Sequence, residues 1–366
     1  MVPIPAGNLR ESELLTTSLR VGEEIDDEIG LVIATSGTTG TPKGAMLTPA
    51  ALIASASATH DRLGGAGNWL LALPAHHIAG MQVLVRCVLA GTVPAELDLS
   101  EGFDITELPR AVAQLGSGRR YTSLVANQLA KALTDTAARA ALAELDAVLL
   151  GGGPAPAPVL DGAAEAGITV VRSYGSSETA GGCVYDGLPL DGVEVRIDQP
   201  NGGGPGRITI GGATLAKGYR NPTDPNPFDE PGWFHTNDVG LVDDSGRLSV
   251  LGRTDDAIST GGLTIMPGLV EVALSRHPAV AECAVFGVPD DRLGQRVVAA
   301  VVAAPGVPWP TLDELTEFLA LSLDRTAAPR EVHAVAELPR YGIGKIDRLA
   351  LRERYSAPDS PGTYGW

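Results

Sequence analysis

A run of hydroxylated residues and glycines that ends near a lysine occupies residues 35–44 (TSGTTGTPKG). It follows residues 29–34, an apolar segment whose pattern predicts a short buried strand. Glycines let a backbone bend sharply and approach a ligand closely, while hydroxyls, exposed N–H groups and an ammonium bind oxyanions. The run therefore predicts a polyphosphate-binding loop rather than a flexible surface turn. It is not a Walker A loop, because Pro42 precedes Lys43 and Gly44 follows it, where that loop has Ser or Thr.

Two further polar segments could complete a nucleotide site. The sequence YGSSET, residues 174–179, follows an expected strand at 168–173. Its aromatic ring could stack on a base, and Glu178 could hold Mg²⁺ together with substrate phosphates. The sequence WFHTND, residues 233–238, ends in a carboxylate, Asp238, that could accept hydrogen bonds from both ribose hydroxyls. A plain Gly-Ser turn and an aromatic β-turn with a capping Asp are the alternatives for these two segments.

Strand-like and helix-like stretches alternate through the first half of the chain, and these elements must position the polar segments. Strands are expected at 68–73, 121–125, 147–150 and 168–173, and helices at 80–90, 104–115 and from the end of the second strand through 143. This alternation of strands and helices (βαβ) predicts a mainly parallel sheet with ligand loops at the carboxyl ends of its strands.

The pattern of expected elements changes at about residue 190, where short strands and turns predict a β-rich subdomain. Its strands are expected at 193–197, 206–210 and 248–251. Helices at 266–275 and 311–323 and strands at 280–288, 297–303 and 332–335 follow, and they predict an α+β module. The fold class is therefore predicted to be α/β. Residues 1–254 form a large N-terminal domain with mainly parallel sheets and a β-rich part at about 190–254, residues 255–355 form a small α+β domain, and residues 356–366 form a flexible tail.

Composition limits the classes of partner. The chain has 366 residues, enough for two or three domains, and a net charge of −17. That charge argues against nucleic acid and anionic membranes, which basic patches bind. The three cysteines lack metal-ligand spacing and are expected to be buried free thiols. With no signal-peptide pattern and no apolar run long enough to span a bilayer, we expect a cytoplasmic protein without membrane insertion.

Seven motifs in order resemble the acyl-adenylate-forming superfamily, which includes acyl-CoA synthetases, luciferases and the adenylation domains of peptide synthetases. The motifs are TSGTTGTPKG (35–44), PAHHIAG (74–80), LLGGGPAP (149–156), YGSSET (174–179), WFHTND (233–238), LGRTDDAI (251–258) and LPRYGIGKIDR (338–348). The resemblance covers residues 29–348. It implies ATP, Mg²⁺ and coenzyme A as co-substrates, and a carboxylic acid as the group that is activated.

The resemblance also implies roles for individual residues. The phosphate contacts would be Thr35, Ser36, Gly37, Thr38, Thr39, Gly40 and Lys43. The other nucleotide contacts would be Gly151, Gly152, Gly153, Ser173, Tyr174, Gly175, Ser177, Asp238 and Arg253. Glu178 would bind Mg²⁺, and Lys345 would reach the acyl carboxylate and the α-phosphate. Asp255 would be the hinge of a mobile C-terminal domain, whose rotation would withdraw Lys345 before thioester formation.

The early position of the phosphate loop resembles the short o-succinylbenzoate–CoA ligases of bacterial menaquinone synthesis. The segments around His77, Ser123 and Gly152 also look like that ligase, and these residues are expected to contact the acid, His77 with a catalytic contribution. The acid has a second, non-reacting carboxylate, which the planar guanidinium of Arg86 could bind. A surface or snorkelling arginine and a packed core histidine are the alternatives, and His76 could be the contacting histidine instead.

The sequence departs from the family pattern at two points, and three other functions are also compatible with it. Ser259 stands where the family usually has a lysine. The short N-terminal part could leave a sheet edge exposed, which we expect a homodimer or a rearranged N-terminus to cover. The rivals are an aryl- or medium-chain acyl-CoA ligase, a stand-alone adenylation domain that loads a carrier protein, and a nucleotide-binding regulatory protein on an enzyme scaffold.

Overall fold

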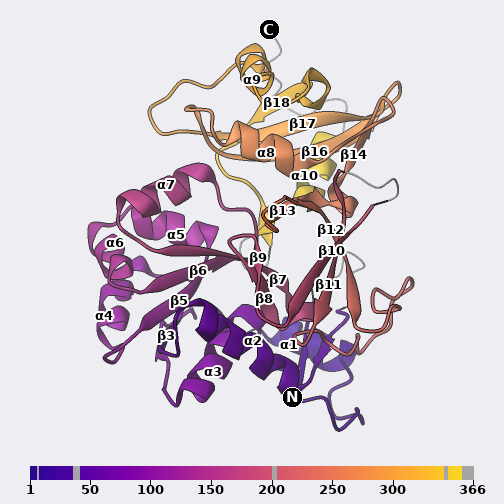
Figure 1. Ribbon diagram of the computed structural model, residues 1–366. Helices are drawn as coiled ribbons and strands as arrows, with labels where there is room; N and C mark the ends of the chain where they lie inside the picture. Colours follow the sequence, from indigo (N-terminus) through magenta and orange to yellow (C-terminus); the bar gives the residue numbers. More distant parts are fainter. Residues whose placement is uncertain (6–7, 36–41, 200–203, 342–344, 357–366) are drawn as a thin grey trace. The chain divides into compact units, whose positions relative to one another are not determined.

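The computed structural model describes residues 1–5, 8–35, 42–199, 204–341 and 345–356 (Figure 1). The chain divides into two compact units, which are described separately. Unit 1 comprises Met1–Gly152, Asp161–Thr236 and Val242–Ser249, and unit 2 comprises Gly153–Leu160, Asn237–Leu241 and Val250–Trp366. The expected flexible tail at 356–366 lies outside the described residues except for Ser356, which ends the last helix.

A seven-stranded sheet in the order β4-β3-β5-β6-β7-β8-β9 forms the centre of unit 1. Its strands are β3 (Asn68–Leu71), β4 (Ala95–Glu96), β5 (Arg120–Val125), β6 (Ala147–Gly151), β7 (Val170–Ser176), β8 (Gly181–Tyr185) and β9 (Leu188–Pro189). The pairs from β4 through β7 are parallel, whereas β8 and β9 add antiparallel strands at one edge. The predicted mainly parallel sheet is therefore confirmed.

Helices flank the parallel strands (Figure 1). They are α2 (Pro49–Arg62), α3 (Ile78–Ala90), α4 (Leu108–Ala113), α5 (Ala126–Leu133), α6 (Thr136–Ala143) and α7 (Ala157–Glu165). Local chemistry sets their ends: Thr48 caps α2 with Pro49 in the first turn, and Gly91 ends α3 in the left-handed conformation. The single helix expected through residue 143 is wrong. Asp135 caps a new helix there, which divides the stretch into α5 and α6.

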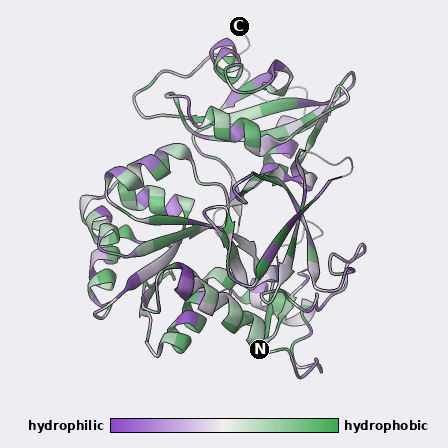
Figure 2. Ribbon diagram, viewed as in Figure 1, coloured by the Kyte–Doolittle hydropathy of each residue, from purple (hydrophilic) through white to green (hydrophobic). Residues whose placement is uncertain are grey.

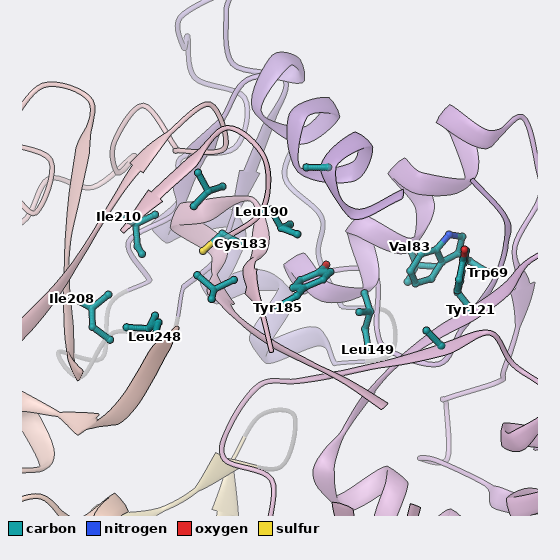
Figure 3. Close-up of a cluster of buried hydrophobic side chains, with 14 of the residues drawn as sticks. Trp69, Val83, Tyr121, Leu149, Cys183, Tyr185, Leu190, Ile208, Ile210 and Leu248 are labelled. Atoms are coloured by element: carbon teal, nitrogen blue, oxygen red, sulfur yellow. The ribbon is translucent and has the colours of Figure 1, made fainter. Parts of the chain in front are cut away.

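Apolar side chains fill the space between the sheet and its helices. Figure 2 shows apolar colouring along β6, and the first four residues of this strand are all buried, as expected for a parallel strand covered on both faces. Figure 3 shows part of this core, in which Trp69 and Tyr121 pack with their ring centroids 4.9 Å apart. The core therefore anchors the strands whose carboxyl ends carry the candidate site.

The strand before the phosphate loop does not belong to the parallel sheet. β1 (Leu31–Ile33) pairs antiparallel with β2 (Ala45–Leu47), so the loop joins the two strands of a separate hairpin. A helix that the sequence did not predict, α1 (Leu9–Ser18), precedes the hairpin, and Asn8 caps it. The buried side chains of Leu15 and Leu19 pack against Val32 of the hairpin.

A four-stranded sheet in the order β10-β11-β12-β13 corresponds to the expected β-rich part. Its strands are β10 (Val193–Asp198), β11 (Gly206–Gly212), β12 (Trp233–Val242) and β13 (Leu248–Arg253). The WFHTND segment lies inside β12, so its interpretation as an aromatic β-turn is wrong. In this strand Phe234 and Thr236 are buried, whereas Trp233, His235 and Asn237 are more exposed, the alternation of a strand with one buried face.

Unit 2 contains a sheet in the order β15-β14-β17-β16, with β18 paired to β17. The strands are β14 (Ile258–Thr260), β15 (Leu263–Ile265), β16 (Val280–Asp290), β17 (Gly294–Ala303) and β18 (Glu331–Ala334). The helices are α8 (Pro267–Leu274), α9 (Leu312–Leu319) and α10 (Arg348–Tyr355), and a short hairpin of β19 (Arg340–Tyr341) and β20 (Lys345–Ile346) precedes α10. The predicted α+β character of this part is confirmed.

The three cysteines, Cys87, Cys183 and Cys283, are buried and unpaired, as predicted. Burial raises the pKa of the Cys183 thiol to about 12, so this side chain stays protonated at neutral pH. Within the described residues, no helix is both long and apolar enough to cross a membrane.

Candidate active site

The described part of the phosphate loop is limited to its two ends. Residues 36–41, which include the predicted contacts Ser36, Gly37, Thr38, Thr39 and Gly40, lie outside the described residues. Thr35 follows β1, and its buried hydroxyl has no hydrogen-bond partner among the described residues. A buried hydroxyl without a partner is costly unless a ligand supplies one. Thr35 therefore fits its predicted role as a phosphate contact.

Glu178 lies in a tight turn between β7 and β8, at the edge of the parallel part of the main sheet. Residues Ser177–Thr179 form a single 3₁₀ turn, and Ala180 follows it with a φ of 50°, in the left-handed region that a non-glycine residue seldom adopts. The carbonyl of Ala180 accepts hydrogen bonds from the Ser55 hydroxyl of α2 (3.0 Å) and the Gln82 amide of α3 (2.7 Å). Two helices thus stabilise the turn that presents the carboxylate.

The Glu178 carboxylate is 8% exposed and has a tyrosine partner that the sequence did not single out. The hydroxyl of Tyr219 donates to Oε1 of Glu178 over 2.6 Å. The ammonium of Lys43 lies 5.4 Å from the centroid of the Tyr219 ring. The structure thus brings the predicted phosphate lysine and the predicted Mg²⁺ ligand to one aromatic side chain. In the sequence, Tyr219 stands only in a Lys-Gly-Tyr stretch (217–219) of an irregular segment, which does not indicate a role at the site.

The first three residues of the YGSSET segment, 174–176, are part of β7 rather than of a loop. Ser173 and Tyr174 pair with Tyr185 and Val184 of β8. A Cβ atom at Gly175 would approach the carbonyl oxygen of Gly181 to 2.1 Å, so only glycine fits this strand pair. Gly175 therefore has a structural reason to be glycine that is independent of its predicted nucleotide contact.

The predicted glycine segment begins at the carboxyl end of β6. Gly151 is the last residue of the strand, and Gly152 has a φ of 84°, which favours glycine. Ser123 lies on the neighbouring strand β5, directly opposite Leu149 of β6, and it is buried. Ser123 and Gly151 therefore lie on adjacent strands of unit 1 and Gly152 directly follows β6, whereas Gly153 belongs to unit 2.

The two histidines of PAHHIAG lie at the start of α3. His77 is the N-cap of the helix, with its backbone extended, and its ring centroid lies 4.2 Å from that of His76. Burial lowers the pKa of His76, and the nearby charge of Glu11 opposes that shift only in part. His76 therefore favours its neutral form at neutral pH, in which one ring nitrogen can accept a hydrogen bond.

Arg86 lies on α3 inside unit 1 and is 2% exposed, so a surface position is wrong. Its guanidinium lies 4.7 Å from the centroid of the Trp69 ring and makes two long hydrogen bonds of 3.4 Å, to the hydroxyls of Thr59 and Tyr185. Its Nε has no hydrogen-bond partner, and no carboxylate of the described residues lies within 4.0 Å. Burial lowers the pKa of this guanidinium, although Tyr185 opposes the shift. A carboxylate partner would offset this cost of burial.

The two predicted ribose contacts meet in unit 2. Nη1 of Arg253 lies 3.4 Å from Oδ1 of Asp238, and Nη2 donates to Oδ2 of Asp255 over 2.7 Å. The amide of Asn237 donates to the same oxygen of Asp255 over 3.1 Å. The predicted hinge residue is therefore held by two donors beside the predicted ribose pair.

The segment that carries Lys345 is described through its backbone. Lys345 pairs with Tyr341 in the β19–β20 hairpin, and Asp347 caps α10 by accepting from the backbone N–H of Ala350 (3.0 Å). Ser259, which replaces the usual lysine of the family, lies on β14, and its backbone N–H donates to the side chain of Gln295 over 2.8 Å.

An ion pair between the buried Glu271 and the partly buried Arg348 connects α10 to the rest of unit 2. Nη2 of Arg348 donates to both oxygens of Glu271 on α8, over 2.6 and 2.7 Å, and the backbone N–H of Val285 donates to Oε1 of Glu271 over 2.8 Å. Nη1 of Arg348 lies 3.5 Å from Asp256, next to the predicted hinge. This network links the start of α10 to the residues that follow β13.

Replacing Glu271 with alanine should lower the free energy of unfolding by about 3 kcal/mol, because it leaves the partly buried Arg348 charge with one partner fewer and removes the acceptor of the Val285 N–H. The measurement is urea denaturation of the full chain. The matched control is Glu282→Ala, which removes the half-exposed partner of Arg340 (2.7 Å) and should cost less than about 1 kcal/mol. Equal losses in the two variants would contradict a special role for the Glu271–Arg348 pair.

Within the described residues, no group of three His, Cys, Asp or Glu side chains could hold a metal ion. Glu178 offers a single carboxylate. Mg²⁺ commonly binds one or two carboxylates and completes its shell with substrate phosphates and water, so the residues present fit that mode of binding.

Comparison with known proteins decides the family. Residues 8–220 match the family model of the AMP-binding enzymes, and residues 269–345 match that of the AMP-binding enzyme C-terminal domain. The chain belongs to the AMP-binding enzyme family. The resemblance to acyl-adenylate-forming enzymes, and the large N-terminal α/β domain with a smaller C-terminal domain, are confirmed.

Relatives in this AMP-binding family include named ligases. A probable 2-succinylbenzoate–CoA ligase of Mycobacterium tuberculosis is 68% identical over 348 residues, which cover 94% of this chain and 90% of the relative. The o-succinylbenzoate CoA synthetase (MenE) of Bacillus subtilis, solved with the acyl-adenylate intermediate OSB-AMP, is 30% identical with a TM-score of 0.77, covering 93% of this chain and 71% of that one. The same enzyme solved with ATP and magnesium gives 30% identity, a TM-score of 0.73, and coverage of 92% and 72%.

Proposed function

We infer that this chain is an AMP-forming 2-succinylbenzoate–CoA ligase of menaquinone biosynthesis. A carboxylate oxygen of 2-succinylbenzoate attacks the α-phosphorus of ATP, and pyrophosphate leaves. The thiolate of coenzyme A then attacks the acyl carbon, and AMP leaves with both electrons of the broken bond. The identity of 68% over 94% of the chain with a mycobacterial 2-succinylbenzoate–CoA ligase carries this inference.

The charges involved in adenylate formation explain the role proposed for each of these contacts. The acid and ATP are both anions, so Lys43 and Lys345 would offset the repulsion between them and stabilise charge in the transition state. Magnesium, when bound, supplies further neutralisation of phosphate charge, and Glu178 would hold it. Asp238 and Arg253 would hold the ribose.

Further contacts would complete the two binding sites. The proposed nucleotide contacts on or beside the main sheet of unit 1 are Gly151, Gly152, Ser173, Tyr174, Gly175 and Ser177, with Gly153 of unit 2 and the loop residues Thr35, Ser36, Gly37, Thr38, Thr39 and Gly40. For the acid, His77, Ser123 and Gly152 would line the site, with His77 contributing to catalysis, and Arg86 would bind the second carboxylate. The partnerless Nε and the long hydrogen bonds of Arg86 support that role.

The second half-reaction needs a different arrangement of the C-terminal part. We propose that residues 255–355 rotate about Asp255 relative to residues 1–254, which would remove Lys345 and admit the thiol of coenzyme A. Asp255 accepts two hydrogen bonds, from Arg253 and Asn237, so rotation would have to break or rearrange them.

A panel of acids tests the proposed substrate. Purified protein is mixed with ATP, Mg²⁺ and coenzyme A, together with 2-succinylbenzoate, benzoate or hexanoate, and products are identified by mass. We expect succinylbenzoyl-CoA, AMP and pyrophosphate from 2-succinylbenzoate, with much weaker turnover of the two monocarboxylic acids. Far better turnover of benzoate or hexanoate would overturn the assignment, and turnover that requires a carrier protein would indicate an adenylation domain instead.

The cellular location and the oligomeric state are part of the proposal. Three buried free thiols support a reducing compartment, and we propose the cytoplasm. We also propose a homodimer, because Val88 near the end of α3 and Val93 in the segment after it are apolar residues that are 78% and 86% exposed. Sedimentation of the purified protein at micromolar concentration would measure its mass, and a monomer would overturn the dimer.

A further inference from the structure

The contact between Tyr219 and Glu178 joins two residues that are 41 positions apart in the chain. We propose that Tyr219 is a positioning residue for adenylation: its hydroxyl orients the carboxylate of Glu178 toward Mg²⁺, and its ring holds the ammonium of Lys43. The inference rests on the roles proposed above for Glu178 and Lys43. It adds a residue that belongs to none of the seven motifs.

The backbone around Tyr219 is bound to the carboxyl end of the phosphate loop. Tyr219 bridges to Ala45, and the N–H groups of Arg220 and Asn221 donate to the carbonyls of Gly44 (2.8 Å) and Lys43 (3.0 Å). The side-chain amide of Asn221 also donates to the carbonyl of Pro42 over 2.8 Å. These main-chain and side-chain hydrogen bonds hold the backbone of Tyr219 beside that of Lys43.

The turn that carries Glu178 is bound to the same segment. The backbone N–H of Ala216 donates to the carbonyl of Glu178 over 2.8 Å, so the segment contacts Glu178 through both its main chain and its side chain. The ring of Tyr219 packs edge-on against Phe228, with centroids 5.5 Å apart, and Phe228 stacks on Phe234 at 4.9 Å. These aromatic contacts leave the Tyr219 ring little freedom to rotate.

The chemistry of the contact suits a metal-ligating carboxylate. A hydrogen bond from a phenol to a carboxylate is short and charge-assisted, and at 2.6 Å it fixes the rotation of the carboxyl group. The bond is made to Oε1, and in this proposal the cation binds through Oε2. The face of the same ring attracts the Lys43 ammonium, which keeps that charge from closing onto Glu178 as a direct ion pair.

Tyr219→Phe removes the hydroxyl and keeps the ring. Because outer partners of a metal ligand change metal affinity by about 10- to 100-fold, we expect the Mg²⁺ concentration for half-maximal pyrophosphate release to rise by at least about tenfold. Calorimetric binding of ATP provides a second readout: in EDTA the affinity should equal that of the wild type, and the gain on adding Mg²⁺ should shrink. Tyr219→Leu also removes the ring, so it should weaken ATP binding in EDTA as well.

Two controls make the test specific. Tyr121→Phe removes the phenol hydroxyl of a fully buried tyrosine, which donates to the carbonyls of Leu63 and Gly65, and it should leave the Mg²⁺ dependence unchanged. If Tyr219 acts through Glu178, then adding Tyr219→Phe to Glu178→Gln should change the Mg²⁺ dependence no further. Unchanged Mg²⁺ dependence in Tyr219→Phe, an equal shift in Tyr121→Phe, or an additive effect in the double variant would each overturn the inference.

Failure of the inference is separable from failure of the proposed function. If the wild type releases pyrophosphate only with another acid, the proposed substrate is wrong, and the Tyr219 variants are measured with that acid. If the wild type converts 2-succinylbenzoate while Tyr219→Phe keeps the wild-type Mg²⁺ dependence, only the role of Tyr219 is wrong. Calorimetry with ATP, Mg²⁺ and EDTA measures the effect without any turnover.

Discussion

Replacing Lys345 with alanine should slow adenylate formation by about 10²- to 10³-fold, while thioester formation from supplied succinylbenzoyl-adenylate stays near the wild-type rate. Removing a preorganised donor from a site of developing negative charge has an effect of this size. The proposed rotation takes Lys345 away before coenzyme A reacts, so the second step should not need it. Pyrophosphate release and single-turnover formation of the thioester measure the two steps separately.

The control for Lys345 is Lys217→Ala, which removes an exposed ammonium that pairs with Glu28 at 2.8 Å. That pair lies on the surface, where its loss should change neither half-reaction. Equal loss in both half-reactions of Lys345→Ala would contradict the proposed rotation. Unfolding of the segment, which would break the hairpin pairing of Lys345 and the cap at Asp347, would impair both steps, so a selective effect on adenylation reports the Lys345 side chain.

Replacing Arg86 with methionine should raise the KM for 2-succinylbenzoate by about 10- to 100-fold and leave the KM for benzoate nearly unchanged. A hydrogen bond to a charged group contributes about 1.5–3 kcal/mol, and only the dicarboxylate has a second anionic group for Arg86 to bind. Steady-state kinetics with both acids gives the two constants. If both acids lose equally, Arg86 is a structural residue of the core.

Stability separates these two roles of Arg86 independently. The guanidinium is buried with an unpartnered Nε and no carboxylate within 4.0 Å among the described residues, so replacement by an apolar side chain of similar length should not lower the melting temperature. A purely structural arginine would instead stabilise the fold through its contacts with Trp69, Thr59 and Tyr185. Its loss would then lower the melting temperature by several degrees.

Local patterns in the sequence predicted much of the fold. The apolar run of β6 and the helix face of α3 depend on neighbouring residues, and both elements lie within two residues of their expected bounds. Patterns of the same kind failed at WFHTND, because the pairing of β12 depends on partner strands rather than on its own residues. The break at Asp135 was missed because the apolar pattern continues across a residue that caps a new helix.

The residues of the candidate site also differ in whether the sequence alone could predict them. The motifs of the site could be predicted because each is a short stretch whose residue types themselves indicate its chemistry. Tyr219 could not, since its meaning lies in contacts with Lys43 and Glu178, which are remote in the chain and depend on how the hairpin and the turn pack. Burial of Arg86 was equally hidden, because the partners that surround it come from α2, β3 and β8.

The hydrogen bond from Gln82 to the carbonyl of Ala180 has a consequence for how such an enzyme could diversify. One helix, α3, begins at His77, carries Arg86, and in between supplies the amide that holds the turn of Glu178. A mutation that shifts or rotates this helix to admit a new acid would therefore also disturb the carboxylate proposed to bind magnesium. New acid preferences in this lineage should arise more readily by exchanging side chains on a fixed helix than by moving it, and a designer would vary the neighbours of Gln82 while keeping Gln82 itself.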